Sequence, residues 1–406
     1  MTSRFALPAF TAYGVELEYA IVDAATLDVV ALAEPLLAAL EARRTKPALT
    51  DWSNELVSHV VEIKNPEPAP SLRPLPDAFQ REVRSANRAL EAFGARLMPS
   101  GMHPFMDPRR ETTLWLASDA SIYRTYDRLF DCRRHGWANV QSMHINLPFA
   151  GDSQFARLHT AIRLVLPLIP ALAASSPFVD GAAVSHRDHR LAVYATHMNR
   201  FPAISGDVVP DVVCSRQEYE QKVLLPMYDA VADADPEGVL RHEWLNARGA
   251  IARFERSAIE IRLADVQECP RADIAVAEAV CAVVQSLYEE RRSSAAQQAC
   301  VPTKRLSHLL GQTIRDGEDA TVDDAEYLLA LGVPAIPRAA GAVWRDLVAK
   351  DAKLENGLEE MLSLILAQGT LSSRLFRRLG ETPARSQMQE VYTELCGCLD
   401  EGRFFR

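Results

Sequence analysis

Four short segments of this sequence carry acidic or imidazole side chains at spacings that could gather them on one face of a β-sheet. Side chains two positions apart on a strand point to the same face, and apolar residues alternate with them here. Carboxylates held this close would repel one another, and divalent cations between them would remove the repulsion. The pattern therefore predicts a cation-binding face over a packed core. The residues are Glu16 and Glu18, Glu55 and Glu62, His144 and Asn146, and Glu260 and Arg262.

The chemistry that suits these side chains is the binding of divalent cations together with phosphate groups. Mg²⁺ takes oxygen ligands and commonly bridges protein carboxylates to phosphates. Arg262 shares a predicted face with Glu260, and a guanidinium can hold two oxygens of a transferring phosphoryl group. We therefore expect Glu260 and Arg262 to act in catalysis. The expected metal ligands are Glu16, Glu18, Glu55, Glu62, His144 and Glu260.

Glu55 and Glu62 do not fit a single regular strand. They lie seven positions apart, and an odd separation places two side chains on opposite faces of an uninterrupted strand. Both can reach one site if Glu55 precedes the regular strand, or if a β-bulge intervenes. The sequence leaves these two arrangements open.

Each pair taken alone also has an ordinary explanation. A Glu-x-Glu pair on a strand usually marks a solvated face, and a single His in a strand is more often hydrogen-bonded structure than a ligand. An Ile-Glu-Ile-Arg strand is usually an exposed ladder of paired charges. The occurrence of all four in one acidic chain, without a glycine-rich phosphate-binding loop, favours a site.

Composition restricts the class of partner and the compartment. The chain has 406 residues and a net charge of −10, so we expect no nucleic acid partner, because the phosphate backbone selects basic surfaces. The most apolar run, residues 164–174, is too short to cross a membrane, and no secretory signal is expected. Seven scattered cysteines indicate a reduced, cytoplasmic protein. Cys396 and Cys398 are interpreted as two thiols at the end of a helix, with a metal or redox role left open.

The remaining pattern predicts the elements that must hold these residues. Alternation predicts strands over residues 12–23 and 55–64, and helical spacing predicts helices over 77–97 and 153–175. Residues 176–250 are rich in Pro, Gly, Asp and His, which indicates functional or disordered loops. Further helices are expected over 32–43, 122–137, 272–298, 323–331, 339–350, 354–368, 370–379 and 386–400.

A series of short motifs also runs through most of the chain. The motifs are Gly14-Val15-Glu16-Leu17-Glu18, Glu55 to Glu62 with Pro66, Gly101 to Phe105, Met143-His144-Ile145-Asn146, Ser175 to Phe178 with Ser185 and Arg187, Glu260-Ile261-Arg262 with Asp265, and Gly369 to Gly380. Their order and spacing resemble the glutamate–cysteine ligase family, and more narrowly its bacterial carboxylate–amine ligase branch. Asn146 stands where many members of that branch have a second His, which removes one potential ligand and keeps a polar group.

The resemblance implies an α+β fold of the glutamine-synthetase-like kind. In that fold a curved, mainly antiparallel sheet with flanking helices holds ATP and two or three Mg²⁺ ions on its concave face, and Mn²⁺ could replace Mg²⁺. We expect residues 1–300 to form the catalytic domain. Residues 301–406 would form a helical C-terminal extension packed on it.

The resemblance also implies a reaction in two steps. Arg262 and Arg187 would contact the phosphates of ATP, and the acidic residues and His144 would be the metal ligands. A substrate carboxylate would attack the γ-phosphate to give an acyl phosphate, and an amine would then displace phosphate and leave an amide. Both substrates would be small molecules, with amino acids expected and glutamate plus cysteine as the reference pair. A homo-oligomer stays open.

Two other functions fit the same residues. A metal-dependent amidase or other hydrolase would use the cluster around an activated water, with no nucleotide requirement. A non-catalytic relative would keep the fold and bind nucleotide without turnover. Nucleotide dependence separates the three, because a ligase releases ADP and phosphate, a hydrolase ignores ATP, and a scaffold does neither.

Overall fold

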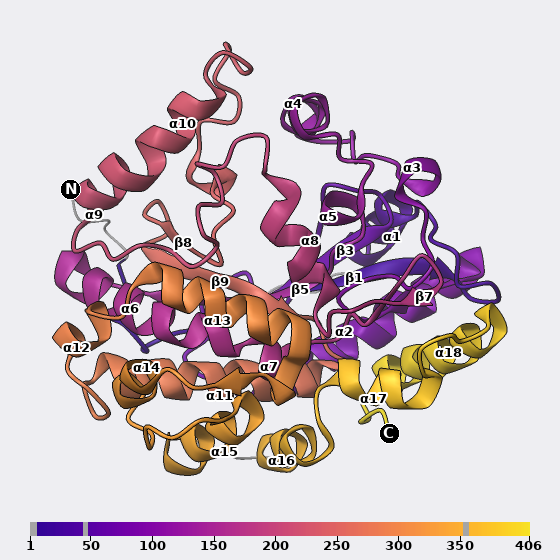
Figure 1. The fold of residues 1–406 in the computed structure, drawn as a ribbon. Helices are drawn as coiled ribbons and strands as arrows, with labels where there is room; N and C mark the ends of the chain where they lie inside the picture. Colours follow the sequence, from indigo (N-terminus) through magenta and orange to yellow (C-terminus); the bar gives the residue numbers. More distant parts are fainter. Residues whose placement is uncertain (1–5, 44–47, 352–356) are drawn as a thin grey trace.

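A seven-stranded sheet forms the centre of the protein (Figure 1). The computed structural model describes residues 6–43, 48–351 and 357–406. The strands pair antiparallel with their neighbours, which confirms the α+β class and the mainly antiparallel sheet expected from the sequence. In spatial order the strands are β2 (Asp51–Asn54), β3 (Val60–Lys64), β1 (Gly14–Asp23), β5 (Ser142–Pro148), β9 (Ala258–Asp265) and β8 (Ala250–Arg253), while β4 (Ala95–Met98) pairs with the end of β1.

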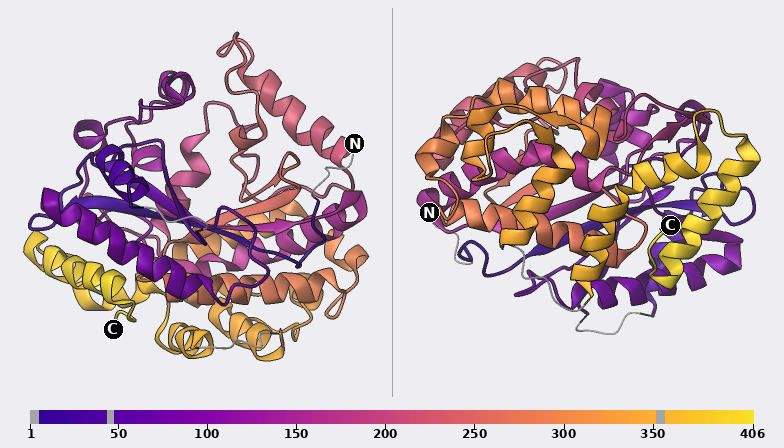
Figure 2. Two further views of the ribbon diagram at one scale, coloured as in Figure 1. Left: turned by 180° about the vertical axis from the view of Figure 1, so that it is seen from behind. Right: turned by 60° about the horizontal axis from the view of Figure 1, so that its bottom comes forward.

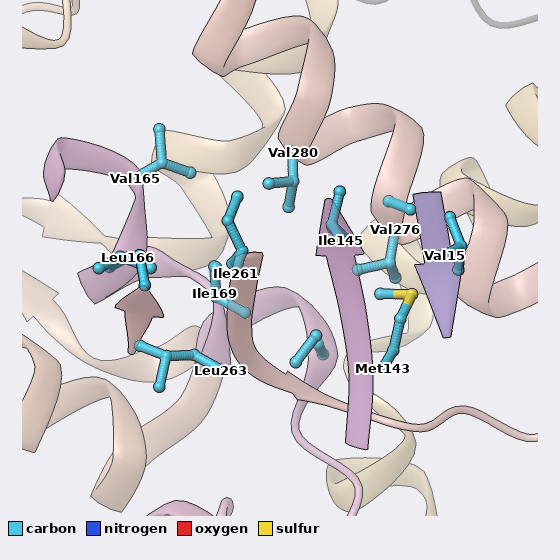
Figure 3. Packing of buried hydrophobic residues seen from close by; sticks show 14 of the residues in the cluster. Val15, Met143, Ile145, Val165, Leu166, Ile169, Ile261, Leu263, Val276 and Val280 are labelled. Carbon is cyan, nitrogen blue, oxygen red and sulfur yellow. The ribbon is translucent and has the colours of Figure 1, made fainter. Parts of the chain in front are cut away.

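One face of the sheet packs on the hydrophobic core. Val15 of β1 and Ile145 of β5 alternate with the polar residues of their strands and are completely buried. Figure 3 shows both beside Val276, which comes from the long helix that crosses this face. The apolar side chains of each strand thus pack in the core, and the polar side chains lie on the other face. The helices on the core side are α11 (Pro270–Tyr288), α2 (Leu75–Leu90), α6 (Gly151–Val165) and α7 (Pro170–Ala173) (Figures 1 and 2).

Short helices from two segments of the chain, residues 120–138 and 189–245, cover the polar face of the sheet. They stand above the sheet in the view of Figure 1, and they enclose the space over β1, β3, β5 and β9. Residues 176–250, expected as loops, are largely irregular but contribute several short helices to this cover, because buried apolar residues such as Val223 and Met227 hold them on the core. The elements are α4 (Ala120–Phe130), α5 (His135–Ala138), α8 (His189–His197), α9 (Arg216–Tyr219), the π-helix η3 (Glu220–Leu224), α10 (Leu225–Val231) and the short 3-10 helix η4 (Glu243–Leu245).

Several predicted elements are shorter than expected. The helix predicted over 77–97 ends at Leu90 and passes through a 3-10 turn to Gly94, whose positive φ of 66° reverses the chain. The following residues form β4, because pairing with β1 overrides their helical spacing. The predicted strand over 55–64 is regular only from Val60, and β2 before it was not predicted.

Three predicted helices are interrupted. The helix expected over 272–298 stops at Tyr288 and resumes as α12 (Ala295–Ala299), because Glu290 has a positive φ of 58°. Pro167 and Pro170 divide the helix expected over 153–175. Asp131, also at positive φ, separates α4 from α5 within the predicted helix 122–137.

The C-terminal helices pack against two different parts of the sheet domain. Helices α15 (Ala340–Asp351) and α16 (Leu358–Gln368) lie on α11, whereas α18 (Arg385–Glu401) lies on α2 and β4 (Figure 2). The amide of Gln80 in α2 donates to the carbonyl of Leu399 in α18 at 2.7 Å. Cys396 and Cys398 are fully buried in this contact. The domain boundary at residue 300 stays a proposal, and residues 354–356 of the predicted helix 354–368 lie outside the described residues.

The remaining elements complete the covering of the sheet. No helix among the described residues is long and apolar enough to cross a membrane. These elements are α1 (Ala33–Glu41), η1 (Glu91–Phe93), α3 (Pro108–Glu111), η2 (Leu166–Leu168), β6 (Phe178–Val179), β7 (Ala182–Ala183), α12 (Ala295–Ala299), α13 (Thr303–Asp316), η5 (Gly317–Asp319), β10 (Thr321–Val322), α14 (Ala325–Ala330), β11 (Arg338–Ala339), α15 (Ala340–Asp351), α16 (Leu358–Gln368), α17 (Leu371–Leu379) and α18 (Arg385–Glu401).

Candidate active site

The strand β1 carries the first two predicted ligands into the middle of the sheet. Leu17, between Glu16 and Glu18, is fully buried in the core, so both carboxylates occupy the opposite face. The antiparallel register sets Glu16 directly opposite His144 on β5 and Glu18 directly opposite Glu62 on β3. Directly opposed residues share a face of a sheet. Three of the four motifs therefore meet on adjacent strands.

Glu55 reaches the same face from the connection between β2 and β3. β2 ends at Asn54 and β3 begins at Val60, so Glu55 precedes the regular strand that carries Glu62. This is the first of the two arrangements that the spacing left open. Glu55 and Glu18 line one cavity over the sheet.

The strand β9 delivers its charged residues through a β-bulge. Its register with β5 shifts across His144, where β9 contains one extra residue. As a result, Glu260 lies opposite Asn146 and Asp265 lies opposite Ser142. In a regular strand, an odd separation would put Glu260 and Asp265 on different faces. The bulge brings both to the polar face.

Two groups of side chains could each hold a cation. One group consists of Glu16, Glu62 and His144, and the other consists of Glu18, Glu55 and Glu62. Within each group the candidate ligand atoms lie within 4.8 Å of one another. Glu62 belongs to both groups, so it would be a ligand common to them. A donor set dominated by carboxylate oxygens fits a hard divalent cation.

The negative charges of the carboxylates in the second group repel one another. Burial raises the pKa of Glu55 well above its usual value, and the charges of Glu18 and Glu62 raise it further. Burial and the charge of Glu16 raise the pKa of Glu62 to about 7, against the opposing effect of Lys64. A bound divalent cation would favour the ionised carboxylates and reverse these shifts.

His144 lies among three carboxylates. Its Nδ1 is 3.1 Å from Glu16 Oε2 and 3.8 Å from Glu260 Oε1, and its Nε2 is 3.8 Å from Glu18 Oε1. Burial acts to lower the pKa of His144, but the hydrogen bond to Glu16 and the charges of Glu18 and Glu260 outweigh it and raise the pKa. Cations on those carboxylates would free a neutral imidazole to act as a ligand.

Glu260 is held by two arginines. Arg262 Nε donates to Glu260 Oε1 at 2.6 Å, and Arg253 Nη1 donates to Oε2 at 3.2 Å. Burial would raise the pKa of Glu260, but the charges of Arg262, His144 and Arg253 lower it to about 2. Glu260 thus fixes the guanidinium of Arg262, which lines the cavity. A planar cation in that place suits an oxyanion of phosphate or carboxylate.

Lys64 belongs to the site although the sequence interpretation left it out. Its Nζ donates to Glu62 Oε1 at 2.5 Å and to Ser53 Oγ at 2.9 Å. It lies two positions after Glu62 and directly opposite Glu16. The same alternation that selected Glu62 could therefore have found it. Its ammonium group offsets part of the negative charge of the cluster.

Arg190 is a second cation at the cavity, and a network that joins three sequence motifs holds it. Its Nε donates to Asp265, and its side chain is 2% exposed. Asp265 also accepts from the backbone N–H of Ser175 at 2.8 Å and from Ser176 Oγ at 2.8 Å. A Cβ placed on Gly101 would lie 2.4 Å from the Asp265 carboxyl carbon. The glycine therefore permits the close approach that completes this network.

Arg187 is not brought to this cavity. Its guanidinium lies 4.2 Å from the ring centre of Phe376 on α17, and its backbone N–H donates to the carbonyl of Arg315. Arg190, three residues later in the first turn of α8, is the arginine that faces the sheet. The structure thus brings together all of the predicted residues except Arg187.

The cavity also has an aromatic wall, which no short-range pattern in the sequence indicated.

A family model decides the relationship of this chain to known proteins. The model of glutamate–cysteine ligase family 2 matches residues 12–394. The chain belongs to glutamate–cysteine ligase family 2. This membership confirms the resemblance and makes the protein a carboxylate–amine ligase, an enzyme that forms carbon–nitrogen bonds.

Two relatives of this chain show how the similarity is distributed. A protein of Archaeoglobus fulgidus, described as uncharacterized, is 29% identical over 356 residues, which cover 86% of this chain and 87% of that one. A protein of Rubrobacter xylanophilus called "Putative glutamate--cysteine ligase 2-3" is 30% identical over 228 residues, which cover 55% of this chain and 57% of that one.

Two solved structures share the fold. Glutamate–cysteine ligase from Francisella tularensis, in complex with AMP, superimposes with a TM-score of 0.58 at 12% identity, over 98% of this chain and 95% of that one. A bifunctional glutathione synthetase from Pasteurella multocida gives a TM-score of 0.54 at 12% identity, over 95% of this chain and 53% of that one. At this identity the likeness shows the fold alone.

Proposed function

We propose that the protein is an ATP- and Mg²⁺-dependent carboxylate–amine ligase that activates one substrate as an acyl phosphate. The observation that carries this proposal is the pair of three-ligand groups that share Glu62 beside the guanidinium of Arg262. Phosphoryl transfer to a carboxylate needs metal ions, which acidic side chains can hold, and a planar guanidinium at the same cavity. Mn²⁺ could take the place of Mg²⁺.

The two ligand groups assign the residues that would hold the metal. Glu16, Glu62 and His144 would hold one ion, and Glu18, Glu55 and Glu62 would hold a second. Glu260 borders the first group, with an oxygen 3.8 Å from His144 Nδ1. When bound, the ions would neutralise the repulsion between the triphosphate and the substrate carboxylate.

The arginines would orient the reacting groups. Arg262, fixed by Glu260, would hold oxygens of the transferred phosphoryl group as their charge develops. Arg190, fixed by Asp265, would add positive potential on the same side of the cavity. A carboxylate oxygen then bonds to the γ-phosphorus while the bond to ADP breaks. The nitrogen of an amine would next attack the acyl carbon, the carbon–oxygen bond to phosphate would break, and one proton would leave the nitrogen.

The finer assignments belong to this proposal as well. Both substrates would be small molecules, with amino acids expected. The seven cysteines are free thiols, which supports a reducing, cytoplasmic environment.

A nucleotide-release assay tests the proposal. Purified protein is incubated with ATP, Mg²⁺ and pairs of acids and amines, and ADP is measured. A ligase releases ADP in amounts that depend on both the acid and Mg²⁺. Amide hydrolysis without nucleotide would support an amidase instead, and nucleotide binding without any ADP release would support a non-catalytic relative.

A further inference from the structure

The cavity beside the metal-ligand groups has an aromatic wall. Tyr126, Trp137 and Trp244 line it, from α4, α5 and η4. The ring centre of Tyr126 lies 5.2 Å from that of Trp137 and 5.8 Å from that of Trp244. The three rings therefore form one surface, which Leu56 and Met198 extend with apolar side chains. Ligation of a small polar acid does not require such a surface.

Two of the polar side chains of this cavity form hydrogen bonds within the protein. Ser142 Oγ donates to Glu18 at 3.0 Å, and the amide of Asn246 donates to the hydroxyl of Tyr219 at 2.7 Å. Glu18 and Glu55 are two of the proposed metal ligands. Glutamate has no ring or other large apolar group, so its binding would leave the faces of Tyr126, Trp137 and Trp244 uncovered.

We propose that the carboxylate substrate carries an aromatic ring, or an apolar group of similar size, that lies on this wall while its carboxylate faces Glu18, Glu55 and Arg262. The inference rests on the proposed ligase function. The cavity volume of about 190 Å³ exceeds the roughly 150 Å³ of an apolar cavity that binds benzene. The indole N–H of Trp137 is buried and has no hydrogen-bond partner among the described residues, so an acceptor on the ring could satisfy it.

An aromatic wall could also stack the adenine of ATP, but its position favours the acid. Ribose and two phosphate groups separate adenine from the γ-phosphate. The cavity wall, in contrast, includes Glu18 and Glu55 themselves. A ring in this cavity therefore lies next to the reaction centre, as the body of the reacting acid must.

Hydroxylamine allows the acid to be tested without knowledge of the amine. A carboxylate oxygen of the acid bonds to the γ-phosphorus, and the bond between that phosphorus and ADP breaks. The nitrogen of hydroxylamine then attacks the acyl carbon, the carbon–oxygen bond to phosphate breaks, and one proton leaves the nitrogen. The products are ADP, phosphate and a hydroxamate, which is measured.

The acids to compare are 3-phenylpropionate, propionate and L-glutamate. We expect kcat/KM for 3-phenylpropionate to exceed that for each of the others by about 10-fold or more, since a buried ring is worth at least that factor in binding. A 10-fold preference for L-glutamate, or equal rates for propionate, would overturn the inference and leave the ligase function intact.

A binding measurement keeps the inference testable if no hydroxamate forms. In that case 3-phenylpropionate is titrated calorimetrically into the protein with Mg²⁺ and a non-hydrolysable ATP analogue. Binding supports the inference, and no binding overturns it. Failure of the ligase function itself is recognised separately, as the absence of hydroxamate from all acids together with no effect of Mg²⁺–ATP on the melting temperature.

Three tryptophan variants locate the ring. Trp137→Leu and Trp244→Leu should each lower kcat/KM for 3-phenylpropionate by about 10-fold and leave propionate nearly unchanged. Trp52→Leu is the matched control, because Trp52 is also half-buried but lies outside this cavity. Melting curves show which variants are folded. A loss of affinity for the ATP analogue in Trp244→Leu, with unchanged preference among acids, would place adenine on the wall and overturn the inference.

Discussion

Glu18 on β1 and Glu62 on β3 are direct cross-strand partners in an antiparallel pair. Like charges in that position destabilise a sheet, yet both side chains are more than 90% buried. Glu55 adds a third carboxylate to the same group. A face built in this way gains stability when cations bind, and that gain can be measured before any substrate is known.

Mg²⁺ and Mg²⁺–ATP should raise the melting temperature by a few degrees. Binding at about 100 times Kd stabilises the native state by about 2.7 kcal/mol, since the unfolded chain has no comparable site. Differential scanning fluorimetry with Na⁺ at equal ionic strength is the control. Glu62→Gln should abolish the response, because Glu62 belongs to both ligand groups. An unchanged response in that variant would contradict the assignment.

Glu55→Gln should abolish turnover and stabilise the metal-free protein. Burial and the charges of Glu18, Glu62 and Glu16 raise the pKa of Glu55, so ionising this side chain in the metal-free protein costs stability. Removing the charge should increase the free energy of unfolding by about 1 kcal/mol. Urea denaturation in EDTA measures it. Glu91→Gln, on an exposed residue, should change neither stability nor activity, and a silent Glu55→Gln would remove Glu55 from the site.

Arg262→Lys should lower kcat by about 100-fold with little change in the melting curve. Lysine keeps the charge but loses the planar fork that holds two oxygens. Arg253→Lys is the matched control, because Arg253 contacts the same Glu260 but does not line the cavity, and it should retain most of its activity. Equal losses in the two variants would mean that Arg262 acts through its ion pair with Glu260.

Gly101→Ala should destabilise the protein by about 2 kcal/mol or more. The added Cβ would lie 2.4 Å from the carboxyl carbon of Asp265, and Asp265 cannot move without breaking its hydrogen bonds to Ser175 and Arg190. Gly311→Ala, in the interior of α13 with no atom within 4 Å of the new Cβ, should stabilise by about 0.5–1 kcal/mol. Chemical denaturation of the two variants shows whether the free energy of unfolding falls in Gly101→Ala and rises in Gly311→Ala.

His159→Leu should make the protein more resistant to acid. Burial, with the charges of Arg163 and Arg248, lowers the pKa of His159 to about 3 from its usual 6.5. Between these values the unfolded chain binds more protons than the native state, so stability falls as pH falls. The contribution reaches about 2 kcal/mol at pH 5. Neither ring nitrogen has a hydrogen-bond partner among the described residues, so leucine loses no such bond.

Denaturation at pH 7.5 and pH 5 measures this effect. The difference between the two pH values should be smaller in His159→Leu than in the wild type. The control is His308→Leu, on an exposed histidine, which should keep the difference of the wild type. An unchanged difference in His159→Leu would show that another group governs the acid sensitivity.

The sequence interpretation succeeded where one local rule applied. Alternation along β1, β5 and β9 was enough to assign Glu16, Glu18, His144 and Glu260 to the polar face, because a strand allows a side chain only two directions. It failed where pairing overrode local preference. Residues 95–97 continue a helical spacing, yet they belong to β4 because β1 offers them a partner.

The sequence alone determined which side chains could bind cations. It also determined the order of the motifs that carry them, and this order indicated the family. The tertiary structure alone decided how those side chains meet. The hairpin places Glu55 beside Glu18, the bulge in β9 turns Asp265 to the face of Glu260, and α8 presents Arg190 and not Arg187 to the cavity. It also assembled the wall of Tyr126, Trp137 and Trp244 from segments more than 100 residues apart. Alternation is a local property of the backbone, whereas register, bulges and helix docking depend on the packing of the whole chain.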